Sequence, residues 1–251
     1  MRRYHRPALE VTVEKELSYL QVYVDAYAHE PEAHQQEAER LWKQHRERVL
    51  FSKGIMSALE RMNDEDRSCM YCGWNEAPCV DHFWPKSRYP HRTFVWDNYF
   101  LSCDPCNRKK SARFPIDSHD QPLLIDLVLE DPHPELFYSL SEGEYVKESS
   151  TERGKACIDV FDLNRSQLVK NRKKVWADVK NCLACYASAL IAGDGGTQAE
   201  KLEPLLYPPK VDIFQEVIFL YKLKSPILTS AQCAVLEHLR QLPDPRLQQL
   251  F

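Results

Sequence analysis

The chain has 251 residues, a formal net charge of −4 and a hydrophobic content of 43%. With a mean hydropathy of −0.52, these values argue against a disordered chain and against a protein embedded in a membrane. The basic opening from Met1 to Pro7 is not followed by an apolar stretch, so we expect no signal peptide, a cytoplasmic location and no membrane partner.

Helical patterns dominate both ends of the sequence. Residues 12–62 are predicted to be helical, with a helix beginning at Pro31. Four prolines predict a loop over residues 114–150, which contains one hairpin that turns at Ser141-Glu-Gly. After the loop, we expect helices over residues 153–161, 165–191 (capped by Asn164), 213–223 and 230–242, with a flexible break at 193–197.

These patterns divide the chain into four parts. We expect an N-terminal helical segment at 1–67 and a cysteine-punctuated module at 68–116. A loop, hairpin and helical region at 117–192 is expected to pack on that module, and further helices to fill 193–251.

Two CxxC pairs lie roughly thirty residues apart, and their spacing is typical of a metal site. Cys69 and Cys72 form the first pair, and Cys103 and Cys106 form the second. Thiolates three residues apart on a tight turn can reach one tetrahedral ion, so the pairs predict structural Zn²⁺. Four unrelated buried cysteines or a redox pair are the weaker alternatives. A third pair, Cys182 and Cys185, lies within a predicted helix, and we expect buried apolar thiols there.

The residues between and after these pairs indicate the chemistry. Asp81 and His82 place a carboxylate beside an imidazole, Asn98 ends Trp96-Asp97-Asn98, and Asn107 directly follows the last cysteine. Carboxylate and amide oxygens can hold a divalent cation against a phosphodiester. An imidazole with a pKa near ~6.5 can deprotonate water at neutral pH. A lone Asp-His pair is usually an ordinary surface pair, and only its place between the cysteine pairs favours a function.

This ordered set resembles the HNH (ββα-metal) nuclease motif over residues Cys69 to Ser111. The resemblance implies a mostly α protein with a small ββα-metal module, that is, an α+β fold stabilised by zinc knuckles. It also implies that His82 is the general base, that Asp81 and Asn107 bind Mg²⁺ or Mn²⁺, and that Asn98 orients the imidazole. Taken alone, Asn98 could be a turn residue, and Asn107 could simply cap the next helix.

Positive charge is concentrated in the same segment. Between Asp81 and Arg113, seven cations and three anions give a net charge of +4, which leaves −8 for the rest of the chain. We interpret Arg108, Lys109, Lys110 and Arg113 as nucleic-acid-binding residues, with a solvated helix face as the alternative.

The flanking sequence resembles PtuB, the family of HNH nuclease subunits in Septu-type and retron-associated anti-phage systems. The similarity runs from about Arg2 to Val175. It includes the segments Phe114-Pro-Ile-Asp and Gln121-Pro-Leu-Leu-Ile-Asp and the sequence from Arg153 to Arg172. The family implies a partner, an ABC/SMC-like ATPase of the PtuA type. This chain has no GxxxxGK phosphate loop, so any dependence on ATP is expected to come from that partner.

The sequence therefore predicts a metal-dependent endonuclease that cuts nucleic acid, with DNA as the favoured substrate, and that acts in anti-phage defence. One alternative is an HNH nuclease that acts on RNA, which nothing in the sequence distinguishes from a DNA nuclease. Another is a zinc-ribbon module that binds nucleic acid without cutting it. The complete set of Asp81, His82 and Asn107 argues against this second alternative.

Overall fold

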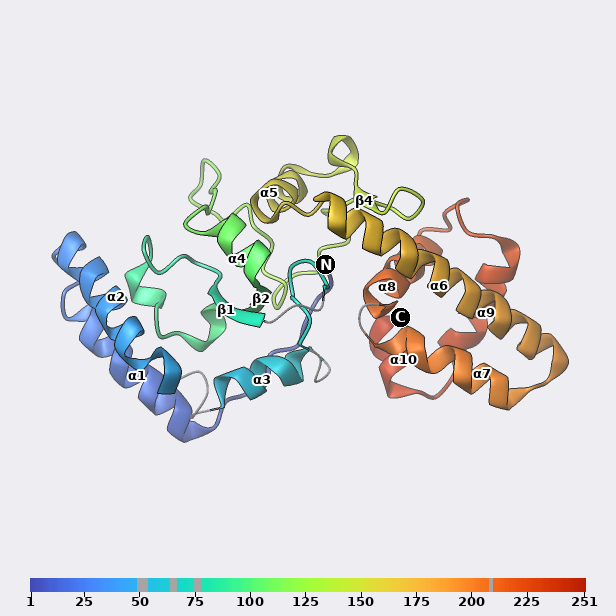
Figure 1. The fold of residues 1–251 in the computed structure, drawn as a ribbon, viewed down its shortest axis with the longest axis horizontal. Helices are drawn as coiled ribbons and strands as arrows, with labels where there is room; N and C mark the ends of the chain where they lie inside the picture. The colour runs from blue at the N-terminus through green and yellow to red at the C-terminus, as the bar shows by residue number, and fades with distance from the viewer. Residues whose placement is uncertain (49–53, 64–66, 75–77, 208–209) are drawn as a thin grey trace.

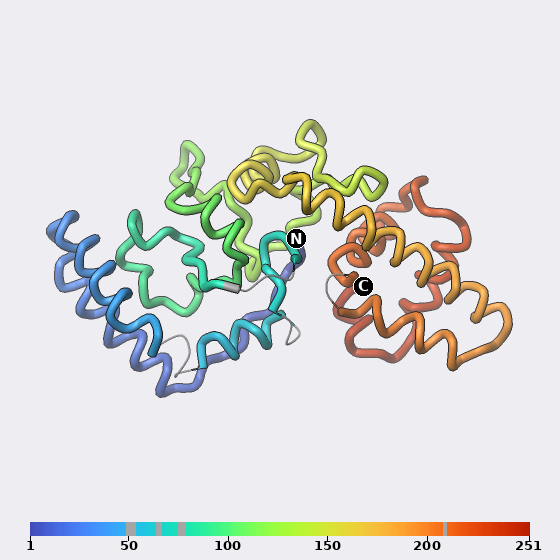
Figure 2. The backbone as a smooth tube through the Cα atoms, in the orientation of Figure 1, coloured from blue at the N-terminus to red at the C-terminus, as the bar shows by residue number. Residues whose placement is uncertain are grey.

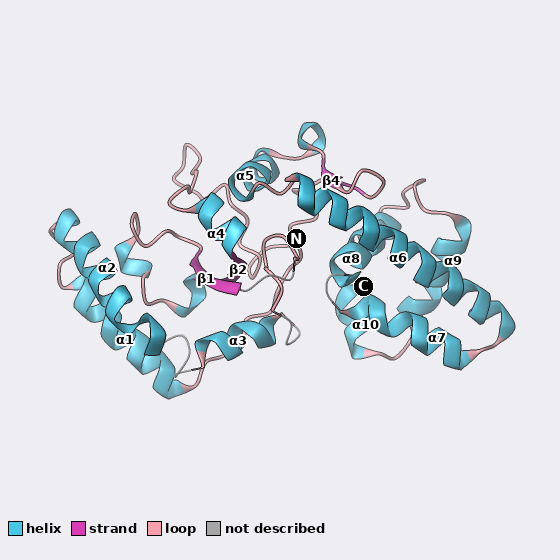
Figure 3. Ribbon diagram, viewed as in Figure 1, coloured by secondary structure: helices cyan, strands magenta, loops and turns pink. Residues whose placement is uncertain are grey.

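The computed structural model describes residues 1–48, 54–63, 67–74, 78–207 and 210–251. This part of the chain is mostly helical, with two small antiparallel sheets (Figures 1 and 3), which confirms the predicted fold class. In chain order the helices and strands are α1 (Val11–Asp25), α2 (Pro31–Glu47), α3 (Ile55–Met62), β1 (Pro78–His82), β2 (Tyr99–Cys103), α4 (Asp104–Lys110), β3 (Tyr138–Ser139), β4 (Glu144–Tyr145), α5 (Glu152–Phe161), α6 (Ser166–Ala192), α7 (Gly195–Leu202), α8 (Lys210–Lys222), α9 (Ser230–Gln241) and α10 (Pro245–Leu250).

The N-terminal helical stretch consists of three helices. Helix α1 buries Val13, Leu17, Leu20 and Val24, one side chain per helical turn, and packs against α2. Pro31 is the first residue of α2, as predicted, because a proline at this position loses no intrahelical hydrogen bond. The part of the predicted helix that falls on residues 49–53 lies outside the described residues.

The cysteine-rich segment folds into two strands and a helix. Strands β1 and β2 pair antiparallel, with Asp81 opposite Phe100 and His82 opposite Tyr99. Helix α4 follows β2 directly and packs against both strands. Acidic Asp104 in its first turn and basic residues in its last turn complement the helix dipole. The expected ββα arrangement is therefore present.

The hairpin predicted within the loop is formed by β3 and β4, although each strand has only two residues. Its closing residue, Gly143, has a φ of +68°, and a Cβ there would collide with the backbone of Val169 in α6. The prediction that Asn164 caps α6 was wrong. Its side-chain oxygen accepts a hydrogen bond from the backbone N–H of Tyr145, and its side-chain amide donates one to the Tyr145 carbonyl. Arg165 occupies the cap position instead.

The C-terminal part is built around α6, which packs against α7, α8 and α9 (Figure 2). The segment expected as a flexible break is a tight turn, in which Gly193 (φ +71°) ends α6 and α7 begins at Gly195. The sequence predicted a domain boundary between residues 192 and 193. Helix α6 nevertheless packs against the helices that follow this boundary. Thr229 caps α9 through a complete capping box.

In the described part of the chain, no helix combines the length and the apolar character that crossing a membrane requires.

Candidate active site

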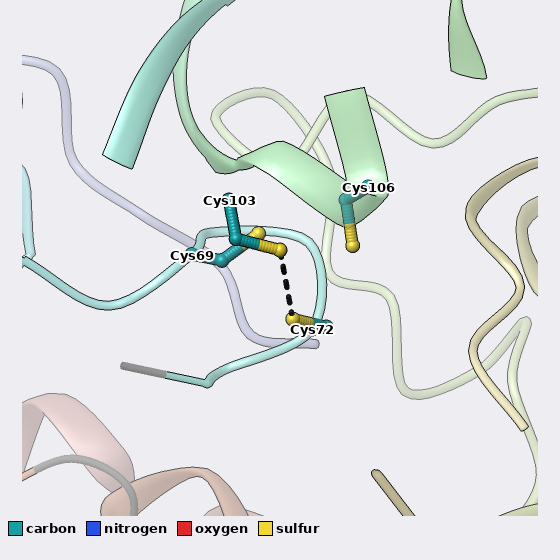
Figure 4. A group of neighbouring side chains, drawn as sticks. All are labelled: Cys69, Cys72, Cys103 and Cys106. Carbon is teal, nitrogen blue, oxygen red and sulfur yellow. Dashed lines mark hydrogen bonds between the residues drawn. The ribbon is translucent and has the colours of Figure 1, made fainter. Parts of the chain in front are cut away.

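The two CxxC pairs come together at the base of the ββα unit (Figure 4). Cys69 and Cys72 lie on a tight turn, Cys103 ends β2, and Cys106 lies in the first turn of α4. All four sulfur atoms lie within 4.8 Å of one another, and those of Cys72 and Cys103 are 3.7 Å apart. A tetrahedral ion with Zn–S bonds of about 2.3 Å needs sulfurs about 3.8 Å apart. The cluster therefore fits a metal ion such as zinc.

Arg165 is part of this cluster, although nothing in the sequence motif points to it. Its guanidinium donates to the sulfur atoms of Cys106 and Cys72, each at 3.5 Å, and of Cys103 at 3.8 Å. Hydrogen bonds from the neighbouring thiols, together with the charge of Arg165, lower the pKa of Cys72. A cation at this position offsets the negative charge that four thiolates would bring to a buried site.

A pocket of about 580 Å³ opens beside this cluster, and it gathers the residues singled out by the motif. Asp81 and His82 contribute from the end of β1, and Asn107 contributes from α4. The other lining residues come from α2, α3, β1, the loop after β1 and the end of α4: Trp42, Arg46, Glu47, Met56, Cys79, Val80, Pro85, Lys86, Ser87, Ser111 and Ala112. The three predicted residues thus share one accessible space.

The His82 ring is held in one orientation. Its Nε2 lies 2.9 Å from the carbonyl oxygen of Thr93, and the ring packs edge-on against Trp42 and Tyr99, with centroid distances of 4.4 and 5.2 Å. Because a carbonyl oxygen can only accept a hydrogen bond, Nε2 of His82 carries the proton and Nδ1 keeps a free lone pair. Burial lowers the pKa of His82 from its unperturbed value to about 3. The imidazole is uncharged at neutral pH.

Asn98 is buried and fastens the loop that follows β1. Its side-chain oxygen accepts from the backbone N–H of Trp84 at 2.7 Å, and its amide group donates to the carbonyls of Trp84 and Arg92 at 3.0 and 2.8 Å. Arg92 directly precedes Thr93, the residue that holds the His82 ring. Asn98 thus holds the loop backbone next to Thr93, and its role in orienting the imidazole stays a prediction from the resemblance.

Asp81 is buried on the opposite face of β1, toward α4. The Tyr71 hydroxyl donates to its Oδ2 at 2.7 Å, and the Lys110 ammonium lies 3.0 Å from Oδ2 and 3.3 Å from Oδ1. Lys110 also donates to the carbonyl of His82 at 2.6 Å, and its side chain is fully buried. Burial raises the pKa of Asp81, while Lys110 and Tyr71 oppose that shift. One ammonium therefore ties together the backbone and the carboxylate of the Asp81-His82 pair.

The expectation that Lys110 binds nucleic acid was wrong, because a fully buried ammonium cannot reach a phosphate. Arg113 is exposed, but its guanidinium is engaged by the protein itself: it donates hydrogen bonds to the carbonyls of Lys109, Asp159 and Val160. Arg108 and Lys109 are exposed, and they form ion pairs with Asp104 and Asp162. Among the described residues that line the pocket, the cations are Arg46 and Lys86 rather than any of these four.

We expect Lys110→Ala to lower the free energy of unfolding by about 3–5 kcal/mol, because it leaves a buried carboxylate without its cation. Lys109→Ala is the matched control: it removes an exposed ion pair from the adjacent position, which is worth at most about 1 kcal/mol. Urea denaturation of both variants measures the difference. Equal losses in the two variants would contradict the structural role of Lys110.

The third CxxC pair remains apart from the site. Cys182 is half-buried and Cys185 is exposed on α6, so the expectation of two buried thiols was wrong for Cys185. In the described residues, the only clustered group of potential metal-binding cysteines, histidines and carboxylates is the set of four cysteines at the ββα unit.

The donor atoms in the pocket suit a hard divalent cation, which prefers carboxylate and carbonyl oxygens. Asp81 and Asn107, which carry such oxygens, both line the pocket. Tyr71 and Lys110 both engage Oδ2 of Asp81, while Oδ1 makes only the longer contact with Lys110. Asp81 and Asn107 are thus the residues of this pocket that would hold such a cation, with Asp81 also paired with the Lys110 ammonium.

Comparison with known proteins agrees with this geometry. The HNH endonuclease family matches residues 69–113, which contain all four cysteines, Asp81, His82, Asn98 and Asn107. The chain is 28% identical over 127 residues to Septu protein PtuB of Bacillus mycoides (strain KBAB4), covering 40% of this chain and 43% of PtuB. It is 31% identical over 103 residues to Septu protein PtuA of the same strain, covering 36% of this chain and 14% of PtuA. The chain thus spans less than half the length of either relative, and the resemblance to PtuB predicted from the sequence is confirmed.

Proposed function

We propose that this chain, which carries an HNH endonuclease domain and resembles a Septu PtuB protein, is a metal-dependent endonuclease that hydrolyses phosphodiester bonds. We further propose that DNA is its substrate and that it acts in anti-phage defence with a PtuA-type ATPase. The observation that carries the proposal is the pocket in which Asp81, a uniquely oriented His82 and Asn107 meet beside a four-cysteine cluster.

His82 acts as the general base in this proposal. Its Nδ1 lone pair accepts a proton from the attacking water, while Nε2 keeps its own proton in the hydrogen bond to Thr93. The water oxygen forms a bond to phosphorus, the bond between phosphorus and the 3′ oxygen breaks, and that oxygen leaves and takes up a proton. The products are a 5′-phosphate and a 3′-hydroxyl.

Asp81 and Asn107 hold Mg²⁺ or Mn²⁺ in this proposal. When bound, such an ion supplies positive charge to the phosphate and to the oxygen that leaves. Arg46 and Lys86 line the same pocket and supply two further cations for the phosphate backbone. Both are paired with carboxylates of α2, Arg46 with Glu47 at 3.6 Å and Lys86 with Glu39, so a bound phosphate would displace these pairs.

The similarity to both PtuA and PtuB of one strain supports a Septu-type assembly. We propose that the partner is an ABC/SMC-like ATPase that supplies the ATP dependence, since this chain has no GxxxxGK phosphate loop.

The test uses the purified protein, with and without the ATPase and ATP, on supercoiled plasmid and on total RNA. We expect plasmid to be nicked or linearised when Mg²⁺ or Mn²⁺ is added and to stay intact without an added divalent ion. Cleavage of RNA alone would overturn the choice of DNA. Binding without cleavage, even with the partner and ATP, would favour the zinc-ribbon alternative.

A further inference from the structure

A second cleft, with a volume of about 570 Å³, lies between the N-terminal segment and the C-terminal helices. One wall consists of Arg2, Arg3, Tyr4 and His5 together with Arg61 and Met62 at the end of α3. The other wall consists of residues before and within α8 and within α10: Leu206, Tyr207, Val211, Gln215, Arg246, Gln249 and Leu250. Figure 1 shows α3 and the N-terminus on one side of this region and α8 and α10 on the other. Its volume is in the range that small organic ligands fill.

The polar groups of this cleft are those that bind phosphate. Among the described residues that line it there are four arginines, one histidine, two tyrosines and two glutamines, and there is no carboxylate. Guanidinium groups bind phosphate in a bidentate manner, and amide and hydroxyl groups add further donors.

Two of the four arginines already form ion pairs with carboxylates that do not line the cleft. Arg2 pairs with Asp212 at 3.4 Å, and Arg246 pairs with both Glu203 and Asp244. Arg3 is exposed, donates a hydrogen bond to the carbonyl of Val128 at 3.4 Å, and forms no ion pair within the described part of the chain. Arg61 is also exposed and forms no ion pair with any residue that the structure describes. These two guanidinium groups are therefore the ones that can take an anion.

Helix α3 connects this cleft to the nuclease pocket. Met56 lines the pocket and Arg61 lines the cleft, and five residues of helix advance by only about 7.5 Å. A DNA strand extends about 3.4 Å per nucleotide, so a few nucleotides are enough to span the distance between these two positions. We propose that the cleft binds the phosphate backbone of the substrate strand beside the cleavage site, an inference that rests on the proposed nuclease function.

The experiment compares wild type with the double variant Arg3→Ala/Arg61→Ala. A fluorescently labelled DNA oligonucleotide is titrated at several salt concentrations without added Mg²⁺ or Mn²⁺, so that it is bound and not cut. Removing two phosphate contacts should weaken binding on the order of tenfold at low salt and lower the slope of log K against log salt by about 1.4–1.8. The matched control is Lys170→Ala/Lys174→Ala, which removes two exposed cations from α6 and should leave the slope unchanged.

Each outcome has a distinct meaning. If wild type neither binds nor cuts nucleic acid, the proposed function fails, and the cleft proposal fails with it. If wild type binds and cuts, but the Arg3/Arg61 variant melts normally and keeps the full salt slope, only the cleft proposal is overturned. A third arm titrates ATP and inorganic phosphate: loss of their binding in the variant, with an unchanged slope for the oligonucleotide, would assign the cleft to a free phosphate ligand and overturn its assignment to the substrate strand.

Discussion

Replacing His82 with asparagine is expected to reduce phosphodiester cleavage by about 10²- to 10⁴-fold, the range that general-base catalysis contributes. Asparagine is smaller than the imidazole and fits in the same space, although its amide is too short to reach the Thr93 carbonyl that now accepts a hydrogen bond from Nε2. It has no nitrogen lone pair of comparable basicity to take a proton from water. The variant should therefore fold, and it should retain its bound metal at the four cysteines.

His91→Asn is the matched control for this change. His91 is exposed in the same loop, and its ring lies next to Tyr89 rather than among the residues that line the pocket. Initial cleavage rates under single-turnover conditions, together with thermal melting curves, measure both variants. Full activity in His82→Asn would refute the assignment of the base, and a loss confined to His91→Asn would transfer that role to His91.

Cys103→Ser is expected to lose the bound zinc and to lower the melting temperature by roughly 10–20 °C. Cys103 ends β2 and is fully buried, so its sulfur lies at the point where the sheet joins α4. A bound structural zinc contributes directly to folding, with apparent values of about 10–16 kcal/mol in small zinc domains. Losing about 5 kcal/mol shifts the melting temperature of a chain of this size by roughly 10–20 °C.

Cys157→Ser controls for the burial of a hydroxyl in place of a thiol. Cys157 is as deeply buried as Cys103 but lies outside the cluster, and its sulfur accepts only a backbone N–H, that of Ile125, at 3.4 Å. Atomic absorption should find wild-type zinc in Cys157→Ser and a deficit in Cys103→Ser. Equal zinc contents in the two variants would show that Cys103 is not a ligand.

Local patterns allowed much of the site to be predicted from the sequence. Thiols three residues apart on a turn, and an asparagine directly after the last of them, are constraints carried by a few consecutive residues. Their geometry therefore follows from the turn and helix that they form. The same holds for the start of α2 at Pro31.

Long-range contacts explain the residues that the sequence did not assign. Arg165 lies 59 residues from Cys106 along the chain, yet its guanidinium reaches three of the four sulfurs. Arg46 borders the pocket because Trp42 of the same helix packs against His82 at the end of β1. No spacing rule connects such positions, since only the packing of separate helices brings them together.

The sequence by itself determined the four-cysteine cluster and the mostly helical class, because the first depends on neighbouring residues and the second on helical periodicity. Only the tertiary structure decided which of the consecutive basic side chains after Cys106 are exposed and which are buried. On a short helix, consecutive lysines face different directions, so Lys109 meets solvent while Lys110 is enclosed against Asp81. Which lysine is enclosed depends on how α4 lies against β1, and that placement is set by contacts between elements rather than by the run itself.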